Sequence, residues 1–470
     1  MNARMMKTTA HDIKDFFIPL EQGDVYFIKT QEDVWLVLSP LANAMLLAKG
    51  DVVQQLDSLL RQDNNRYVNH QLATAAEALS RIIPAGDRIA RISAPQDLQK
   101  LSILPTQACN LSCSYCYAAA GRSADRLGWE KLKGTLEYFI DAGRLKSRYL
   151  TISFIGGGEP LLEWEMVKKG IEYAGKRAAE QGFRVDITLI TNGTVMNDEM
   201  AAFLKAHRVL PNISFDILED VQQKQRGHYD QVMATLDCLI RNGHQPSVNA
   251  TITPENVERM DQMAGLMFRR FPDIKLMIFE PVVDPGIFAT AQDLRGFYVK
   301  YTREIFRVRQ MAREKGCIIE CRILNNVGEI LDRGCPPKLT LTPRGDLTIC
   351  YCVSSPLEKS FKKRVYGRAD DQGKLCFDQE KFSAICSENV YSFNKCEHCF
   401  AKWYCAGGCM CPNDLYDEAR LEVLCGFTRE LVARELTGRV QRRHFRKNGE
   451  DILQILSAGE NEISPVYSVG

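Results

Sequence analysis

The sequence predicts an α/β protein built around a partial, open (β/α)6 TIM-like barrel, with an N-terminal winged-helix-like module and a C-terminal cysteine-rich domain. Strand and helix patterns alternate six times between Leu101 and Glu280, as in a parallel sheet covered by helices. Six units are fewer than the eight that close such a barrel. Eleven of the 17 cysteines lie between Cys335 and Cys425. We therefore expect divisions at 1–95, 96–315 and 316–438, with a tail at 439–470.

The composition is that of an ordinary globular protein. The 470 residues are 45% hydrophobic and 25% charged, and 60 basic residues balance 59 acidic ones. This balance gives no indication of binding to nucleic acid or to an acidic membrane. No apolar run approaches the length of a membrane span, and the first residues lack the apolar core of a signal peptide. We expect a soluble, cytoplasmic protein, and in a reducing cytosol clustered cysteines more often bind metals than form disulfides.

The N-terminal module shows strand signals followed by helix signals. A helix is expected from Ser39, its N-cap, to a stop at Gly50, and a second helix then runs to about Arg61. Two short strands precede them around a turn: Val25–Lys29, Val34–Leu38 and the turn at Gln31–Asp33. This order suggests a small winged-helix-like fold.

The central region carries the β/α alternation. Because parallel strands end at one edge of a sheet, functional residues are expected in the loops that follow the strands. The expected strands are Leu101–Pro105, Tyr149–Ile155, Arg184–Thr191, Asn212–Phe215, Ser247–Thr253 and Ile274–Glu280.

A cysteine loop follows the first of these strands. Cys109, Cys113 and Cys116 have the spacing C-x3-C-x2-C. Three thiolates can hold three irons of a [4Fe–4S] cube and leave the fourth iron open to an outside ligand. The spacing alone also allows a structural zinc site with a distant fourth ligand.

The loop and its position resemble the signature of radical S-adenosylmethionine (SAM) enzymes, and Tyr115 fits the aromatic residue before the third cysteine. This resemblance implies that the amino and carboxylate groups of SAM bind the open iron. It also implies that one electron cleaves SAM to a 5′-deoxyadenosyl radical, which removes hydrogen from a substrate. Gly156–Pro160 (GGGEP) resembles the family's GGEP motif. The SAM contacts implied by family resemblance are Gly157, Gly158, Glu159, Pro160, Thr191, Asn192, Ser214 and Arg226.

The C-terminal cysteines resemble the SPASM extension of radical SAM enzymes, whose full spacing makes a zinc knuckle a poor alternative. Cys335 and Cys350 flank Gly345 as C-x9-G-x4-C, and a C-x2-C-x5-C-x3-C run starts at Cys396. The resemblance implies two auxiliary [4Fe–4S] clusters, and with the SAM-binding cluster three in all. The implied distal ligands are Cys396, Cys399, Cys405 and Cys425, and the implied proximal ligands are Cys335, Cys350 and Cys409.

The sequence does not identify the fourth ligand of the proximal cluster. The family position about six residues before Cys335 is Glu329 rather than cysteine. Cys321 or Cys317 is a candidate, and an open iron that takes a substrate thiolate is the other hypothesis. Cys352 and Cys411 lie beside implied ligands and are alternates.

The resemblance implies a maturase that abstracts hydrogen from a ribosomally synthesised precursor peptide and forms a thioether or carbon–carbon cross-link. The N-terminal module is similar to peptide-recognition domains, which bind a leader peptide as an added edge strand. The expected partners are this precursor peptide and an electron donor such as flavodoxin or ferredoxin, with no nucleic acid and no membrane.

Several alternatives remain. A sulfatase-type maturase that makes formylglycine usually has Asp where this chain has Tyr351. A peptide epimerase is another enzymatic function that fits the sequence. The non-enzymatic alternative is an iron–sulfur electron carrier or a peptide-binding chaperone. No catalytic residue is identified, and Asp216, Glu280 and Tyr351 are weak candidates for a general base.

Overall fold

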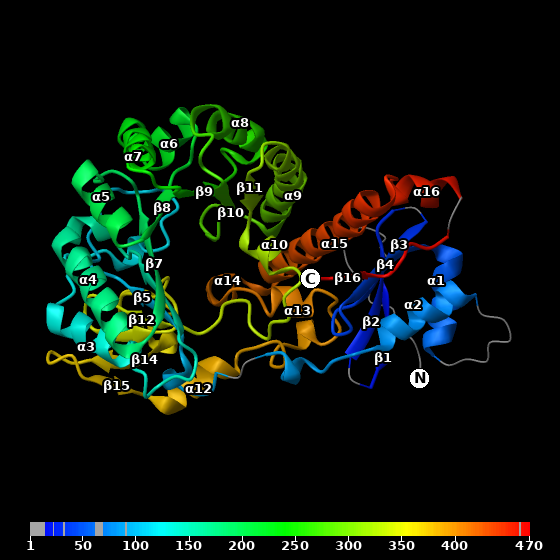
Figure 1. Cartoon of the computed structure of the whole chain (residues 1–470), viewed down its shortest axis with the longest axis horizontal. Helices are drawn as coiled ribbons and strands as arrows, with labels where there is room; N and C mark the ends of the chain where they lie inside the picture. The colour runs from blue at the N-terminus through cyan, green and yellow to red at the C-terminus, as the bar shows by residue number, and fades with distance from the viewer. Residues whose placement is uncertain (1–14, 22, 32, 62–68, 90–91, 460–461) are drawn as a thin grey trace.

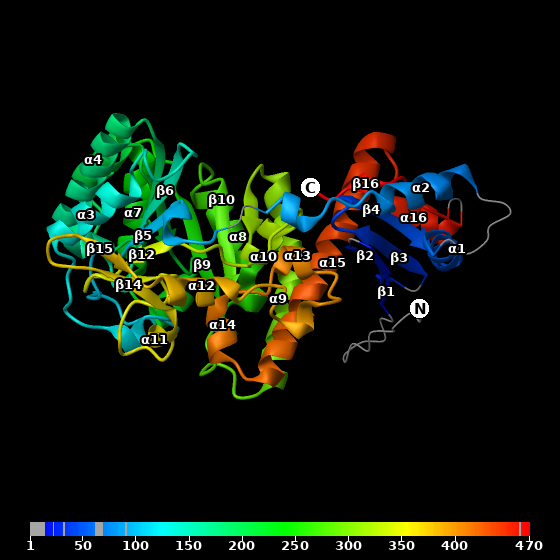
Figure 2. The same cartoon turned by 90° about the horizontal axis from the view of Figure 1, so that it is seen from below.

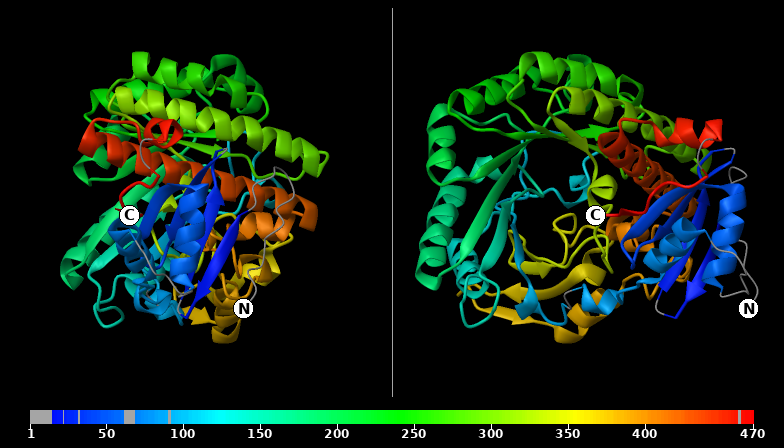
Figure 3. Two further views of the ribbon diagram at one scale, coloured as in Figure 1. Left: turned by 90° about the vertical axis from the view of Figure 1, so that its right-hand side faces the viewer. Right: turned by 45° about the vertical axis from the view of Figure 1, so that its right-hand side comes forward.

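The computed structural model describes residues 15–21, 23–31, 33–61, 69–89, 92–459 and 462–470 (Figure 1). They form an α/β fold with an 11-stranded, mostly parallel sheet and a separate 5-stranded sheet. The large sheet curves into an incomplete ring with helices outside it, and the small sheet lies beside that ring (Figures 1 and 3). The described strands do not close into a barrel, because the strand order has two free ends. The predicted open α/β architecture is confirmed.

The parallel part of the large sheet contains all the strands expected in the central region. They pair in sequence order, and each runs parallel to the next. One further short parallel strand, β11, extends this edge. The strands are β5 (Lys100–Ile103), β6 (Tyr149–Phe154), β7 (Arg184–Thr191), β8 (Leu210–Ser214), β9 (Ser247–Ile252), β10 (Leu276–Pro281) and β11 (Ile318–Glu320).

Amphipathic helices cover the outer face of this sheet, so its cores lie between strands and helices (Figure 1). The longest of them, α9, packs against α15, a long helix that leads from the ring to the small sheet. The outer helices are α3 (Trp129–Phe139), α4 (Trp164–Gln181), α5 (Asp198–Ala206), α6 (Glu219–Gln225), α7 (Tyr229–Arg241), α8 (Met260–Arg270) and α9 (Ala291–Glu314).

The cysteine-rich region continues the large sheet beyond β5. Strand β12 (Leu339–Leu341) pairs parallel with β5, and β13 (Asp346–Thr348), β14 (Val365–Ala369) and β15 (Leu375–Phe377) follow antiparallel. These strands are too short to show a period in the sequence. The helices of this region and of the C-terminus are α10 (Arg322–Asn326), α11 (Phe361–Arg364), α12 (Gln379–Ser387), α13 (Lys402–Cys405), α14 (Met410–Leu415), α15 (Glu418–Asn448) and α16 (Ile452–Ala458).

The small sheet differs from the expected N-terminal module. The predicted helix from Ser39 to Gly50 is wrong: the segment Ala44–Lys49 is strand β4, paired with β3. Its side chains are buried on both faces, and Asn43 makes the preceding turn with φ of 54°. Gly50 begins helix α1 rather than ending a helix. The other elements are β1 (Phe16–Leu20), β2 (Gly23–Lys29), β3 (Val34–Ser39), β16 (Tyr467–Ser468), α1 (Gly50–Leu60) and α2 (His70–Ser80).

The predicted strands Val25–Lys29 and Val34–Leu38 are present within β2 and β3. The turn expected at Gln31–Asp33 includes Glu32, which lies outside the described residues.

The C-terminal segment, which the sequence predicted only as a tail, is folded onto this small sheet. Strand β16 pairs antiparallel with β4, and the Ser464 amide donates to the Leu47 carbonyl at 2.8 Å. The Leu47 amide in turn donates to the Ser464 hydroxyl at 2.9 Å. The first and last parts of the chain therefore form one unit (Figure 1).

The small sheet has two packed faces. One face packs against α1 and α2, while the other packs against α13, α15 and α16. Phe17 of β1 stacks on His398, between Cys396 and Cys399, with ring centroids 4.5 Å apart. The small sheet thus lies directly against the cysteine-rich region (Figure 2). Among the described helices, none has the length and apolarity needed to cross a membrane.

Candidate active site

The loop with Cys109, Cys113 and Cys116 follows β5 and is half-buried. The three thiols lie near one another, since Cys109 and Cys116 both contribute to raising the pKa of Cys113, behind the larger effect of burial. Arg122 donates from Nη2 to the Sγ of Cys116 at 3.3 Å. A cationic donor beside a thiolate fits a cluster ligand, because it offsets negative charge. Arg122 was missed in the sequence, since an arginine six residues after a cysteine carries no distinctive signal.

Tyr115 connects this loop to two other loops. Its hydroxyl donates to the Asp216 carboxylate, at 2.7 Å from Oδ2, and accepts from Arg226 Nη1 at 3.0 Å. Asp216 is fully buried and also accepts from the Thr251 amide at 3.2 Å. Burial raises the pKa of Asp216, and the charge of Arg226 opposes that effect. The carboxylate is thus enclosed by donors, and Asp216 as a general base stays a prediction.

The glycines of the GGGEP loop allow it to lie against the cysteine loop. A Cβ on Gly157 would come within 1.9 Å of Gln107 Oε1, and one on Gly158 within 1.9 Å of the Ala108 carbonyl. The Glu159 amide donates to that Ala108 carbonyl at 2.9 Å. Only glycine fits such a contact. The loop therefore forms a close cradle next to Cys109.

The Glu159 side chain points to the end of β7. It is buried, and its carboxylate accepts from the Thr191 hydroxyl at 2.6 Å and from the Asn192 amide at 2.7 Å. Burial raises its pKa, and these hydrogen bonds oppose the rise. The carboxylate oxygens are thus engaged within the protein, and Glu159 as a direct contact to SAM remains a prediction.

Asn192 links the end of β7 to the cysteine loop. Its Nδ2 donates to Asn110 Oδ1 at 2.9 Å and approaches Cys109 Sγ at 3.8 Å. Asn110 in turn donates to the Thr194 hydroxyl at 2.8 Å. Asn110 lies inside the C-x3-C spacing and was missed because any residue is allowed there. Ser214 ends β8 at the same edge of the sheet.

The implied distal cysteines form one group. Desolvation raises the pKa of the half-buried Cys405 thiol to about 12, and charge on Cys399, Cys425 and Cys396 adds to that rise. Cys399 also lies beside the Arg429 guanidinium. Four thiols thus share one location: Cys396 and Cys399 come before α13, Cys405 ends α13, and Cys425 lies on α15. A set of four thiolates is the usual donor set for an iron–sulfur cluster.

The implied proximal cysteines gather with two further thiols. The Sγ atoms of Cys350, Cys352 and Cys411 all lie within 4.8 Å of one another. The thiol of Cys335 neighbours that of Cys350, and the thiol of Cys409 neighbours that of Cys411. The donor set is thiols alone, as expected for an iron–sulfur cluster.

A pocket lies between the end of β10 and these cysteine groups. It is lined by Glu280, Arg322, Cys405, Cys409 and Cys425, among others. Burial raises the pKa of Glu280, and Arg322 opposes the rise through its charge and through its amide, which donates to Oε2 at 3.0 Å. The Arg322 guanidinium lies beside Cys409. Glu280 is therefore the candidate base with a pocket next to it.

Tyr351 has a different environment. Its ring packs edge-on against Tyr117, with centroids 6.2 Å apart, and Lys338 Nζ lies 4.9 Å from its ring centre. The hydroxyl of Tyr117 donates to the Gly156 carbonyl at 2.6 Å. Tyr351 thus links the proximal cysteine segment to the GGGEP loop.

The comparisons with known proteins agree with this geometry. Residues 103–267 match the model of the Radical SAM superfamily. A GTP 3′,8-cyclase from Corynebacterium glutamicum (strain R) is 31% identical over 36% of this chain and 44% of its own length. A serine-type anaerobic sulfatase-maturating enzyme from Klebsiella aerogenes is 22% identical over 64% of this chain and 77% of its own.

Solved structures show the same fold. Native anSMEcpe with bound AdoMet and Cp18Cys peptide has a TM-score of 0.57 and 17% identity, over 72% of this chain and 98% of that one. This chain spans less than half of the length of the cyclase it matches. Residues 103–267 are therefore a radical SAM domain, a class that implies SAM and one [4Fe–4S] cluster. In this chain the radical SAM domain is followed by a cysteine-rich region that is similar to the SPASM extension.

Proposed function

We propose that this protein is a maturase that removes hydrogen from a ribosomally synthesised precursor peptide and installs a side-chain cross-link. The observation that carries the proposal is the pocket lined by Glu280 of β10 together with Cys405, Cys409 and Cys425. It lies between the radical SAM domain and the auxiliary cysteines. A substrate held there is next to both.

The residues of the chain fit three clusters and SAM. Cys109, Cys113 and Cys116 would hold the SAM-binding cluster, and the cradle of Gly157 and Gly158 leaves backbone groups free to meet SAM. The bound cofactors supply one-electron cleavage of SAM and an acceptor for the electron that a substrate radical releases. Tyr115, Asp216 and Arg226 orient the cysteine loop that would hold the SAM-binding cluster.

Glu280 would take up a proton from the substrate in the pocket. Its side chain is about 42% exposed and lines the pocket, and its raised pKa favours proton binding. Arg322 beside it would orient an anionic group of the peptide, since its guanidinium lines the same pocket. These roles are compatible with a polar peptide substrate.

The small sheet supports recognition of a peptide strand at one edge. The edge of β4 is taken by the chain's own segment around Ser464 and by β16. Of the described strands, β1 is the other edge strand of that sheet. Because β1 contacts His398 through Phe17, a leader strand added there would lie close to the cysteine-rich region.

A formylglycine-forming maturase is the second candidate. It is favoured by the similarity to the Klebsiella aerogenes sulfatase-maturating enzyme over 64% of the chain. Tyr351 replaces the Asp that this activity is expected to need, and its environment of Tyr117 and Lys338 is not that of a base.

The test is coexpression with each short peptide encoded next to the gene, followed by mass spectrometry of the peptide. Cross-linking removes two hydrogen atoms per event and joins two residues in the fragment spectra. A product that reacts with a hydrazide probe contains an aldehyde and supports the sulfatase-type activity. Deuterium gain from heavy water without loss of mass supports epimerisation.

Two controls accompany this test. The variant Cys109→Ala should leave the peptide unmodified, because the SAM-binding loop loses a thiol. Hydrogen exchange of β1 should slow when a genuine leader peptide is added, while β16 should not change. Reduced protein that does not cleave SAM to 5′-deoxyadenosine would contradict the proposal at its first step.

A further inference from the structure

Five cysteines meet where two segments of the cysteine-rich region cross: Cys335, Cys350, Cys352, Cys409 and Cys411. A [4Fe–4S] cluster needs only four protein ligands. Thiolates that share one metal centre lie a few ångströms apart, because metal–sulfur bonds are about 2.3 Å long. The mutual spacing of at most 4.8 Å for Cys350, Cys352 and Cys411 fits such a centre.

Cys411 occupies the central place in this group. Its Sγ lies within 4.8 Å of those of Cys350 and Cys352, and its thiol neighbours that of Cys409. It therefore bridges the ligand expected on the β13 side and the ligand expected at the start of α14. Cys352 lies on the same segment as Cys350, two residues after it, and neighbours Cys350 and Cys411.

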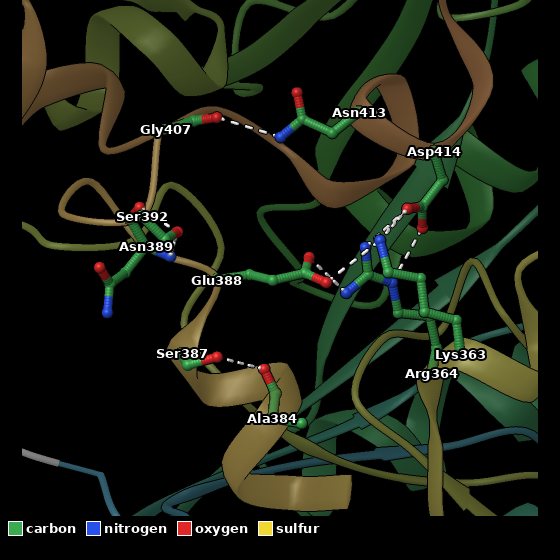
Figure 4. Close-up of polar contacts among 10 residues, drawn as sticks. All are labelled: Lys363, Arg364, Ala384, Ser387, Glu388, Asn389, Ser392, Gly407, Asn413 and Asp414. Atoms are coloured by element: carbon green, nitrogen blue, oxygen red, sulfur yellow. Dashed lines mark hydrogen bonds and ion pairs between the residues drawn. The ribbon is translucent and has the colours of Figure 1, made fainter. Parts of the chain in front are cut away.

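A buried arginine holds the two segments in register (Figure 4). Arg364 is fully buried and donates to both carboxylate oxygens of Asp414, at 2.8 and 2.7 Å. Asp414 lies on α14, three residues after Cys411. The Arg364 carbonyl accepts from the Ile349 amide at 3.2 Å, directly before Cys350. A planar, bidentate pair of this kind fixes geometry as well as charge.

Cys321 has different neighbours. It is buried at the start of α10, and its thiol lies beside Tyr301 and the carboxyl of Glu280. Glu329, at the expected family position, is exposed. Cys321 is thus surrounded by a hydrophobic core and by the pocket residue Glu280 rather than by a group of thiols.

We propose that Cys411 is the fourth ligand of the proximal auxiliary cluster, beside Cys335, Cys350 and Cys409, with Cys352 as a neighbouring free thiol. A cluster closed by the chain's own thiolates has no position for a substrate thiolate. The inference rests on the auxiliary cluster expected in this region, not on peptide maturation. Its test needs no peptide, so its failure is distinguishable from failure of the proposed function.

The test measures iron, sulfide and the EPR spectrum of anaerobically purified, reduced full-length protein. The Cys411 variant is made in a protein that already carries Cys352→Ser, so that Cys352 cannot replace Cys411 as a cluster ligand. In that background Cys411→Ser should lower iron by about four per chain or shift the EPR signal of one cluster. Cys352→Ser alone and the matched buried variant Cys321→Ser should keep the iron content and spectrum of the unchanged protein.

Three results would overturn the assignment. One is a Cys352→Ser/Cys411→Ser double variant with full iron and an unchanged spectrum. The others are loss of a cluster in Cys321→Ser or in Cys352→Ser alone. The SAM-binding and distal cysteines are unchanged in all variants, so the EPR signals of their clusters report whether each variant is folded.

Discussion

Tyr115 shows how a single side chain can fix the geometry of the SAM-binding loop. Its hydroxyl bridges Asp216 and Arg226, which come from the loops after β8 and α6. The three groups are largely inaccessible to water, and a buried polar group that loses its partner keeps its desolvation cost. The cysteine spacing is therefore supported by a network that no local motif contains.

At the residue scale we predict the effect of Tyr115→Phe. The variant removes the bridge and should lower the free energy of unfolding by about 1–3 kcal/mol, since Asp216 and Arg226 both lose a partner. Lower retention of iron during gel filtration and a lower thermal midpoint should report this loss. The matched control is Tyr149→Phe, because Tyr149 is 44% exposed and its hydroxyl donates to Asp186 Oδ2 at 2.8 Å. Equal midpoints and iron contents for the two variants would show that the bridge contributes nothing.

At the scale of elements, α9 and α15 are joined by a buried cluster of charges. Glu435 on α15 is 2% exposed and pairs with Arg309 of α9 at 2.6 Å. Arg439 and Arg442 lie at 3.0 and 3.1 Å from the same carboxylate. This joint matters because α15 carries Cys425 and then continues to the small sheet.

We predict that Glu435→Gln destabilises the protein at neutral pH by about 3 kcal/mol, because three arginines lose their buried counter-charge. The exposed pair of Glu430 with Arg434 is the control, and Glu430→Gln should cost less than about 1 kcal/mol. Thermal midpoints of both variants measure the difference.

The same carboxylate gives a pH dependence. Burial alone would raise its pKa, but the arginines, Arg309 first, hold the pKa below the usual value of 4.5. A group with a depressed pKa contributes its stability above the unfolded-state value and loses it as the pH falls through the folded-state value. The difference in the free energy of unfolding between the unchanged protein and Glu435→Gln should therefore become smaller below about pH 4.5. A gap that stays constant into acid would contradict this account of the joint.

At the scale of the whole molecule, the chain begins and ends in the same sheet. The segment 462–470 covers the edge of β4, which is the last of the four N-terminal strands in sequence. An uncovered edge strand tends to pair with another chain. The C-terminal segment therefore protects a surface that residues more than 400 positions earlier create.

We predict that deletion of residues 462–470 weakens the small sheet. The Leu47 amide loses its partner Ser464, so its hydrogen exchange should become faster, and the protein should form larger species on gel filtration. Ser464→Ala removes only the hydroxyl and should cost about 1 kcal/mol without a change in size. Unchanged exchange at Leu47 in the deletion variant would show that the segment has no structural role.

Much of the fold could be predicted from the sequence. The strands β5 to β10 have clear alternation with helices, and their ends shift by only a few residues between prediction and structure. Segment Ala44–Lys49 was misread because its residues suit a helix, while its strand form depends on pairing with β3 and β16. Strands of three residues, such as β12 and β13, have too few positions to show a period.

The class of the central domain could be predicted from its residues alone, because the cysteine loop and the glycines at a strand end are local features with fixed spacing. Three features became visible only in the folded chain: Cys411 lies among the proximal thiols, Asp216 is enclosed by Tyr115 and Arg226, and the C-terminal segment completes the first sheet. The physical reason is distance along the chain. A spacing motif specifies neighbours within one loop, whereas these contacts join segments that meet only when the sheets and helices pack.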